Sequence, residues 1–272
     1  MESSPRAETT SSDAQSSLAT AGTLLILVLL PIAFGLGRPG GMELDRFRAI
    51  LTGSFDSHAP LTRAILQFLA VGAVWTVCVA LAAILVSLPA ATALALGRMA
   101  QRRPLALAAT AAIESVRALP VLLLIYYIYF RLGNASYRFV PRDALAVTLA
   151  LAIYTSAVNA EIIRAGILSL PKEQFEAAHA LGLTGGQTLY HVILPQTLRR
   201  VLGPLIAQFA TVLKDTSLGA VIGTVELAQR GKIVFQKLGN PLETYYLIAI
   251  IYFALNFLLG RLSEWIAHRQ PR

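Results

Sequence analysis

Long stretches without charged residues alternate with short charged ones along most of the chain. No charge lies between Asp13 and Arg38, or between Arg63 and Arg98. A helix needs roughly 20 apolar residues to cross a bilayer core of about 30 Å. The pattern therefore predicts six membrane-spanning helices, at about residues 18–36, 64–97, 118–131, 144–168, 202–225 and 244–266.

The fold class follows from the backbone. Polar backbone groups in lipid must be satisfied internally, and the alternation of period two that is typical of barrel strands is missing. We therefore predict an all-α, polytopic bundle of about six transmembrane helices. The second stretch is too long for one straight crossing, so we expect Pro89 to kink it or its end to run past the membrane. The segment "PLALAATAAI" before the third crossing is either an interfacial helix or part of that crossing.

Composition agrees with a membrane protein. Of 272 residues, 56% are hydrophobic and 14% are charged, whereas soluble domains carry about 25% charged residues. The net charge of +8 is spread over doublets such as Arg102–Arg103 and Arg199–Arg200, which suit anionic lipid headgroups better than nucleic acid. The single cysteine, Cys78, excludes an internal disulfide, and we expect its thiol to be buried.

The N-terminal region is expected to lie outside the main bundle. Residues 1–17 are polar and rich in Ser and Thr, which is typical of a disordered tail. Residues 18–37 are interpreted as a retained extra helix, because the acidic tail makes a poor signal-peptide start and no small-residue cleavage site follows. Residues 38–63 then form an extramembrane loop, and residues 64–272 form the core.

A polar segment between the fourth and fifth spans, "PKEQFEAAHALGLTGGQTLYHVILP", is predicted to form a helix–turn–helix elbow. Pro171 suits the first helical position, and Glu173 with Glu176 suits the positive end of the helix dipole. Phe175, Ala178 and Leu181 recur at three-residue spacing as one apolar face.

The turn and the second helix of the elbow are also marked in the sequence. Gly182 can adopt the left-handed conformation that ends a helix. Thr184 and Gln187 have the spacing of a capping box. The second helix is expected to turn its apolar face, Leu189, Val192 and Ile193, inward and to end before Pro195.

The elbow is open to three interpretations: a loop folded onto its own bundle, a DNA-binding helix–turn–helix, and a docking element for a partner protein. The second is disfavoured, because the segment is not enriched in Arg and is tethered by spans on both sides.

The elbow resembles the EAA loop of permease subunits of binding-protein-dependent ABC importers. That pattern is Glu-Ala-Ala, three residues, Gly, nine residues and Ile-x-Leu-Pro. It is matched by Glu176, Ala177, Ala178, Gly182, Leu194 and Pro195, with Val192 in place of Ile. The segments "ESVRALPVLLLIYYIYF", "NAEIIRAGILSLPKEQFEAAHALGLT" and "VLKDTSLGAVIG" are similar to permeases for polar amino acids, and the resemblance runs from about Phe68 to the C-terminus.

Two features depart from this family. Its core has five spans, so the span at 18–37 is extra. In addition, Ala118-Leu119 stands where the family often has Gly-Thr before Pro.

The resemblance implies a function and a set of partners. The chain would be the permease of an importer for a polar amino acid in the bacterial inner membrane, with a cytoplasmic EAA loop at 171–198. Two copies of a separate ATPase would bind ATP and Mg²⁺, and Phe175 and Leu181 would join the EAA residues in docking them. A second permease, identical or different, and a periplasmic binding protein would complete the assembly, with membrane lipids around it. An ion-coupled secondary carrier or a channel is the alternative.

Charged residues inside the spans are candidate functional residues, because an ionisable group at the bilayer centre costs about 2.5 to 3.5 kcal/mol. Glu114 with Arg117, and Glu161 with Arg164, lie three apart on one helix face, so each pair can neutralise itself, and a structural role is favoured for both pairs. Adjacent charges such as Lys214 and Asp215 cannot pair in this way and lie near mid-membrane. The possible translocation path therefore comprises Glu114, Arg117, Lys214, Asp215, Thr216 and Ser217.

Other features of the spans are expected to be structural. Gly219 and Gly223 have the GxxxG spacing that allows close helix contact. The tyrosines at 126, 127 and 129 are typical of an interfacial aromatic belt.

Catalytic and cofactor motifs are missing from the sequence. There is no GxxxxGK[ST] phosphate loop, no His or Cys spacing of a metal site and no recognisable nucleophile turn. The chain is therefore not expected to be an enzyme, to bind a metal or to hold a cofactor itself.

Overall fold

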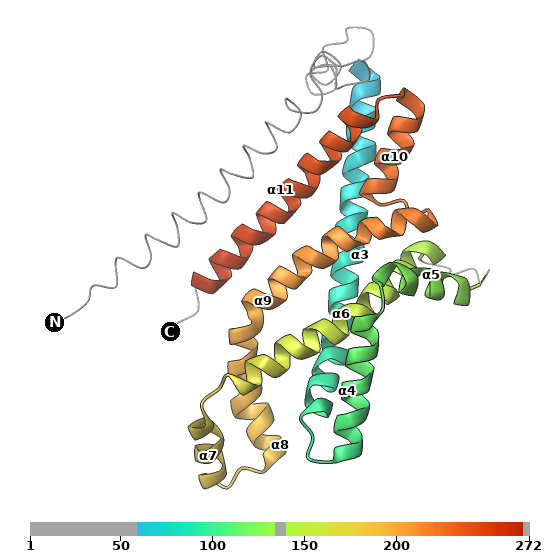
Figure 1. Cartoon of the computed structure of the whole chain (residues 1–272). Helices are drawn as coiled ribbons and strands as arrows, with labels where there is room; N and C mark the ends of the chain where they lie inside the picture. Colours follow the sequence, from blue (N-terminus) through green and yellow to red (C-terminus); the bar gives the residue numbers. More distant parts are fainter. Residues whose placement is uncertain (1–58, 134–139, 269–272) are drawn as a thin grey trace, which may run out of the picture. The chain divides into compact units, whose positions relative to one another are not determined.

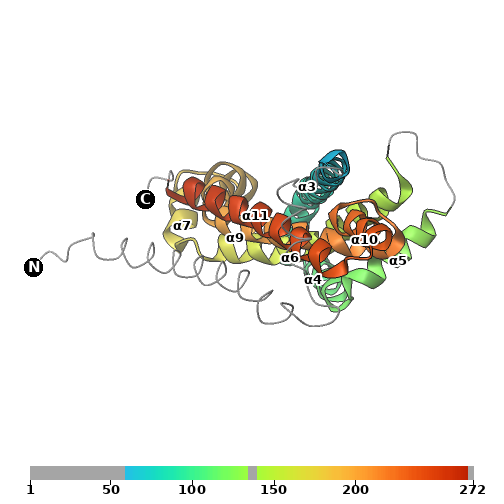
Figure 2. The ribbon, with the colours of Figure 1, turned by 90° about the horizontal axis from the view of Figure 1, so that it is seen from above.

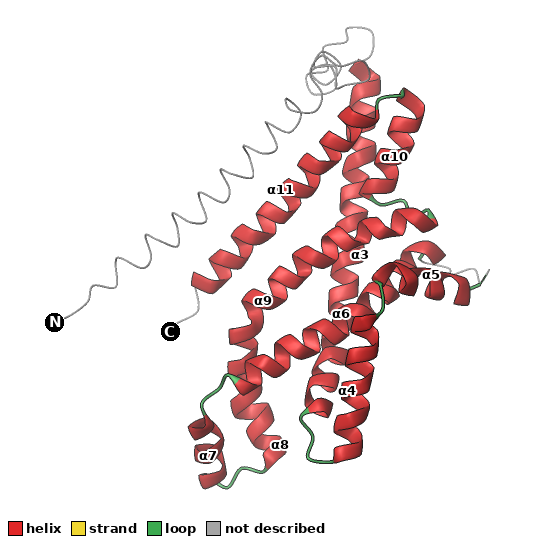
Figure 3. Cartoon of the chain, viewed as in Figure 1, coloured by secondary structure: helices red, strands yellow, loops and turns green. Residues whose placement is uncertain are grey.

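The computed structural model describes residues 59–133 and 140–268, and every regular element in these ranges is helical (Figures 1 and 3). The expected tail at 1–17, the extra helix at 18–37 and most of the loop at 38–63 lie outside the described residues. The chain divides into two compact units. One comprises Phe68–Ile233 with Ile251–Arg272, and the other comprises Met1–Gln67 with Val234–Ile250.

Four described helices are long and apolar enough to cross a membrane, or five crossings if the bent pair α4–α5 counts as one. The first long helix, α3 (Ala59–Arg98), is a single helix of 40 residues that passes through Pro89. At 1.5 Å per residue it is about 60 Å long, twice the bilayer core. The helix is therefore long enough for one end to run past the membrane, as the second of the two expectations held, and the kink at Pro89 stays a prediction.

The third crossing is broken. Helices α4 (Arg103–Ala118) and α5 (Val121–Arg131) meet at a bend of 100°, and α5 runs away from the end of α4 in Figures 1 and 2. Leu119 is extended, as expected for a residue that precedes a proline, and Pro120 is the N-cap of α5. The segment 103–118 is thus a helix of its own.

Helix α6 (Arg142–Leu168) forms the centre of the larger unit and packs antiparallel to α9 (Leu194–Asp215) and the 3₁₀ helix η2 (Thr216–Ile222). A Cβ on Gly219 would lie 2.7 Å from Val147 Cγ2, so this glycine allows the close approach that its spacing predicted. The prediction was wrong for Gly223. That residue has φ +86°, a Cβ added to it would meet nothing within 4 Å, and it ends η2 as its left-handed cap.

Two buried clusters stabilise this unit. The first joins α3, α5, α6 and α9 and consists of Val79, Ala80, Ala83, Ile125, Val147, Ala150, Leu151, Ala152, Val212 and Leu213. The second lies nearer the elbow and consists of Ala91, Ala95, Ile113, Ala157, Ala160, Ile163, Ile167, Leu170 and Ile193. The expected burial of Cys78 is wrong: its side chain is exposed on α3, on a helix surface suited to lipid.

The last two helices are α10 (Leu227–Leu238) and α11 (Pro241–His268). Gly239, at φ +68°, turns the chain between them. Within the smaller unit, Thr244 Oγ1 donates to Asn240 Oδ1 over 3.2 Å, and the rings of Phe235 and Tyr245 lie 5.4 Å apart. The first of these contacts ties the residue before α11 to the first turn of that helix.

Candidate functional site

The first arm of the elbow is α7 (Lys172–Ala180), and a glycine ends it as predicted. Gly182 has φ +76°. Its N–H donates to His179 O over 2.9 Å, and Leu183 N–H donates to Ala178 O over 3.1 Å. These two bonds are the pair found in a Schellman motif, which satisfies the last carbonyls of a helix. The turn is therefore fixed by the backbone itself.

The second arm begins with the predicted capping box and continues further than expected. Thr184 N–H donates to Gln187 Oε1 over 2.9 Å, and Gln187 N–H donates back to Thr184 Oγ1 over 3.4 Å. Helix α8 (Gly185–Gln187) then leads through a π-helical segment, η1 (Thr188–Ile193), directly into α9.

The prediction that this arm ends before Pro195 was wrong. Proline lacks an N–H and its ring clashes with the carbonyl four residues back in a regular helix. Here the wider π turn precedes the proline, and Leu194 N–H bonds to Leu189 O, five residues back. The helix therefore absorbs Pro195, and the elbow and the fifth span form one continuous helical segment, Gly185–Ile222.

The inner side of the elbow packs against the second cluster. Ala178 and Ile193 are buried, and Phe175, Leu189 and Val192 pack against the cluster. The inward face predicted for the second arm is thus confirmed. The expected single face of the first arm is wrong at Leu181, because this side chain is 81% exposed after the helix has ended.

Polar contacts fix the elbow to the helices on either side. Gln196 Nε2 donates to Gln174 Oε1 over 3.1 Å and joins the two arms. Arg200 Nη1 donates to Ser169 O over 2.9 Å and joins α9 to the end of α6. The elbow is therefore held at both of its roots.

Gly166 allows α6 and α9 to approach each other closely beside the elbow. A Cβ on Gly166 would overlap Val201 Cγ1 and lie 3.1 Å from Thr197 Cγ2. Val201 and Thr197 are themselves buried. Movement of the elbow would therefore act directly on the helix crossing.

The charged residues near this end form a network that differs from the expected pairs. Glu161 Oε2 accepts from Arg164 Nη2 over 2.9 Å, as predicted. Glu114, however, pairs with Arg98 over 3.2 Å and not with Arg117, and Arg98 also binds Glu161 over 2.6 Å. Sequence spacing alone missed Arg98, because it lies at the end of α3 and reaches two other helices.

Two of the candidate path residues, Glu114 and Arg117, lie exposed on α4, and the other four lie on α9 and η2. Lys214 is exposed in the single chain, and Asp215 is partly buried. Thr216 and Ser217 donate their hydroxyl hydrogens to the carbonyls of Leu213 and Lys214, over 2.9 and 2.7 Å. These two hydroxyls are thus engaged by their own helix, and the two charged side chains remain available for contacts beyond it.

Charged and apolar groups lie side by side on the outer surface of the elbow. Glu173, Glu176, Ala177 and Pro195 are exposed, and Leu194 is partly buried. Leu181 and Tyr190 are large apolar side chains that remain mostly exposed. Exposed apolar groups rimmed by charges are typical of a protein-binding surface.

Two further expectations concern metal binding and the tyrosines of α5, whose place in an interfacial aromatic belt stays a prediction. No group of three or more His, Cys, Asp and Glu among them could hold a metal ion. Arg142 lies over the Tyr129 ring, 4.0 Å from its centroid, and Tyr126 stacks on Phe130, whereas Tyr127 is exposed.

Comparisons with known proteins give consistent matches. The sequence profile of the family described as "Binding-protein-dependent transport system inner membrane component" matches residues 83–271. The glutamate transport system permease protein GluD of Corynebacterium glutamicum is 40% identical over 192 residues, which cover 70% of this chain and 69% of that protein. The glutamine transport system permease protein GlnP of Escherichia coli (strain K12) is 39% identical over 158 residues, covering 56% and 71% of the two chains.

Solved structures show the same relationship. A crystal structure of an amino acid ABC transporter with histidines superposes with a TM-score of 0.68 at 31% identity, covering 75% of this chain and 95% of that chain. A structure of the MetNI methionine ABC transporter in an inward-facing conformation superposes with a TM-score of 0.64 at 18% identity, over 78% of this chain and 99% of that chain. The second likeness shows a shared fold.

Proposed function

We propose that this chain, which belongs to the family of binding-protein-dependent transport system inner membrane components, moves a polar amino acid across a bacterial inner membrane as the permease of an ABC importer. The resemblance seen in the EAA pattern is confirmed by the family match and by relatives named as glutamate and glutamine permeases. ATP and Mg²⁺ would bind to a separate ATPase, two copies of which act on a pair of permeases. A periplasmic binding protein would deliver the substrate.

The observation that carries this proposal is the construction of the elbow. Its turn is fixed by the bonds of Gly182 and by the Thr184 capping box, and its second arm continues into a membrane span. Leu181 and Glu176 on its outer surface are exposed and available to a partner. A rigid lever with an exposed tip and a buried root can pass the movement of an ATPase to the spans.

The test is co-purification of the full chain with the ATPase of its own cell. We expect Gly182→Val to lose most of the bound ATPase, because a β-branched residue at positive φ distorts the turn. Gly239→Val is the matched control, since Gly239 also has positive φ with nothing within 4 Å but lies far along the chain from the elbow. We expect Glu176→Lys to weaken the complex without changing the yield of the chain. Equal retention of the ATPase by all variants contradicts the docking role.

Lys214 and Asp215 belong to the translocation path in this proposal. Helix α6 contacts the α9–η2 segment at two points, where Gly219 lies against Val147 and where Val201 lies against Gly166. Lys214 lies between these two contact points in the sequence, and therefore beside the middle of α6. A charge at this depth requires a cavity or a partner chain. The variant Lys214→Met with Asp215→Asn is therefore expected to lose uptake while keeping its bound ATPase. Normal uptake at normal expression removes both residues from the path.

A further inference from the structure

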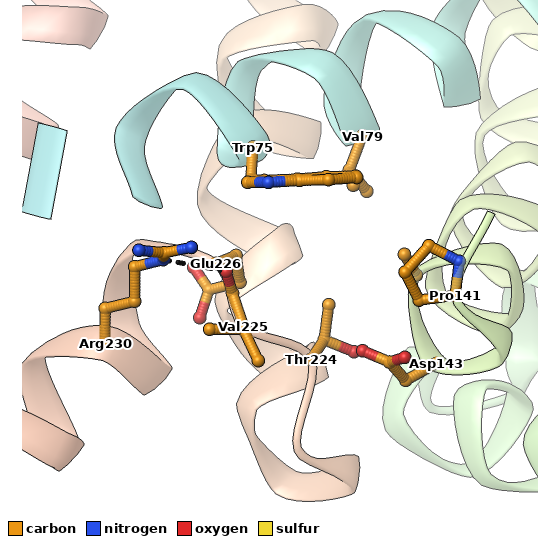
Figure 4. A pocket seen from close by; sticks show the side chains of 9 residues that line it. Trp75, Val79, Pro141, Asp143, Thr224, Val225, Glu226 and Arg230 are labelled. Atoms are coloured by element: carbon orange, nitrogen blue, oxygen red, sulfur yellow. Dashed lines mark hydrogen bonds between the residues drawn. The ribbon is translucent and has the colours of Figure 1, made fainter. Parts of the chain in front are cut away.

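A pocket of about 160 Å³ lies at the end of the α6–α9 pair that is opposite the elbow (Figure 4). Its walls come from α3, from the start of α6, and from the segment that joins η2 to α10. The lining residues are Trp75, Val79, Pro141, Asp143, Ala144, Thr224, Val225, Glu226 and Arg230.

Glu226 builds the pocket and is not free to bind a ligand with its carboxylate. Its Oε2 accepts from Thr76 Oγ1 over 3.2 Å, from Tyr252 Oη over 2.9 Å and from Ala228 N–H over 3.0 Å. Its Oε1 accepts from Gln229 N–H over 2.9 Å. The bonds from Thr76 and Tyr252 join the start of α10 to α3 and α11, and the other two satisfy N–H groups in the first turn of α10. Glu226 therefore holds this wall in place.

Asp143 and Arg230 give the pocket two oppositely charged ends. In Figure 4 they stand on opposite sides of the hollow. Asp143 lies in the first turn of α6, and its carboxylate has no ion pair or hydrogen bond within the described residues. Arg230 donates from Nε to Val225 O over 3.2 Å and from Nη1 to Phe68 O over 3.1 Å. A guanidinium has five N–H donors, so donors remain for a ligand.

Thr224 is the second, independent sign of a ligand. It is 3% exposed and lines the pocket, and its Oγ1 has no hydrogen-bond partner within the described residues. A buried hydroxyl without a partner costs about 1 to 3 kcal/mol. The helix dipole favours an acid in the first turn and would by itself account for Asp143 at this position. It does not account for the unpartnered hydroxyl of Thr224.

We infer that this pocket binds a free α-amino acid as a zwitterion, with its ammonium group at Asp143 and Thr224 and its carboxylate at Arg230. The side chain of the amino acid lies against the indole of Trp75, which is 39% exposed. Two separated charges of opposite sign, a buried hydroxyl and an aromatic wall match the groups that every α-amino acid carries. The inference rests on the proposed function and adds an amino-acid site at the side remote from the ATPase.

The experiment measures binding to the full chain, purified with its ATPase, by tryptophan fluorescence. The chain has two tryptophans, so in a Trp265→Phe background the signal comes from Trp75 in the pocket. L-glutamine is the probe. N-acetyl-L-glutamine lacks the ammonium group, and L-glutamine α-amide lacks the carboxylate. We expect each blocked form to bind at least about tenfold more weakly than L-glutamine, because a hydrogen bond to a charged group is lost.

Variants then match each end of the ligand to its residue. We expect Asp143→Asn to weaken L-glutamine binding about tenfold to hundredfold and to abolish discrimination against the N-acetyl form. Arg230→Gln is expected to abolish discrimination against the α-amide, whereas Lys232→Gln, an exposed change on the same helix, leaves it intact. A misfolded variant would bind all three probes more weakly. Loss of discrimination against one blocked form in each variant therefore separates a binding defect from a folding defect.

Three outcomes overturn the inference. The first is no response of Trp75 to L-glutamine, and the second is equal binding of all three probes. The third is no effect of Asp143→Asn on glutamine binding but a weaker complex with the binding protein, which makes the pocket a docking contact for a side chain of that protein. If the elbow variants lose the ATPase while the pocket binds nothing, the importer proposal stands and only this inference fails.

Discussion

Replacing Gly166 with alanine tests the crossing of α6 and α9 at the root of the elbow. The added Cβ would overlap Val201 Cγ1, and valine is a stiff side chain with few alternative rotamers. Overpacking of this kind costs about 1 to 3 kcal/mol, and we take the upper end because the overlap is severe. The change from glycine to alanine within a helix returns about 1 kcal/mol. We therefore expect Gly166→Ala to lower the free energy of unfolding by about 2 kcal/mol.

Unfolding of the purified chain by titration with a denaturing detergent, followed by circular dichroism, measures this loss. Gly203→Ala is the matched control, because Gly203 lies in α9 with nothing within 4 Å. This control is expected to be neutral or to stabilise by up to about 1 kcal/mol. Val201→Ala should destabilise the parent chain but rescue Gly166→Ala, because it removes the overlapping methyl groups. If Gly166→Ala unfolds like Gly203→Ala, or if Val201→Ala costs the same in both backgrounds, the close crossing is wrong.

Two further predictions concern charged groups. Arg98→Gln should lower the free energy of unfolding by about 1 to 3 kcal/mol, because it leaves the partly buried Glu161 with one cation and Glu114 with none. The control is Arg117→Gln, which breaks no described ion pair and should have little effect in the same detergent titration. Burial raises the pKa of Glu226 above its ordinary value, so the folded chain holds this proton more tightly than the unfolded chain. Stability from this group is therefore greatest at low pH and falls as the pH rises through the raised pKa. Glu226→Gln should flatten that fall above the ordinary pKa of 4.5, and an unchanged profile of unfolding midpoint against pH would contradict it.

The parts of the site that could be predicted from the sequence are those that depend on neighbouring residues. A glycine with positive φ at 182 and a capping box at Thr184 are local devices, and both were found as expected. The failures involve residues far apart in sequence or an unusual helix geometry. Arg98 reaches Glu114 and Glu161 on two other helices, so spacing along one helix could not reveal it. The π turn before Pro195 lets a helix continue where local rules predict an end.

The pocket was not foreseen for the same reason, and its position gives it significance. Asp143 lies at the start of α6 and Thr224 follows η2, so the two residues are far apart in the sequence. Only the packing of η2 against α6 brings them to one wall of the pocket. The same two helices meet the elbow at their other end, where Gly166 crosses Val201. A ligand at one end and an ATPase at the other would therefore act on a single helix pair. Any coupling between the two sites must be reciprocal. If a bound ATPase changes the affinity of the chain for the amino acid by some factor, then a bound amino acid changes its affinity for the ATPase by the same factor. Saturating L-glutamine should then shift the affinity of the ATPase for the wild-type chain, and this shift should vanish in Asp143→Asn while ATPase binding itself remains.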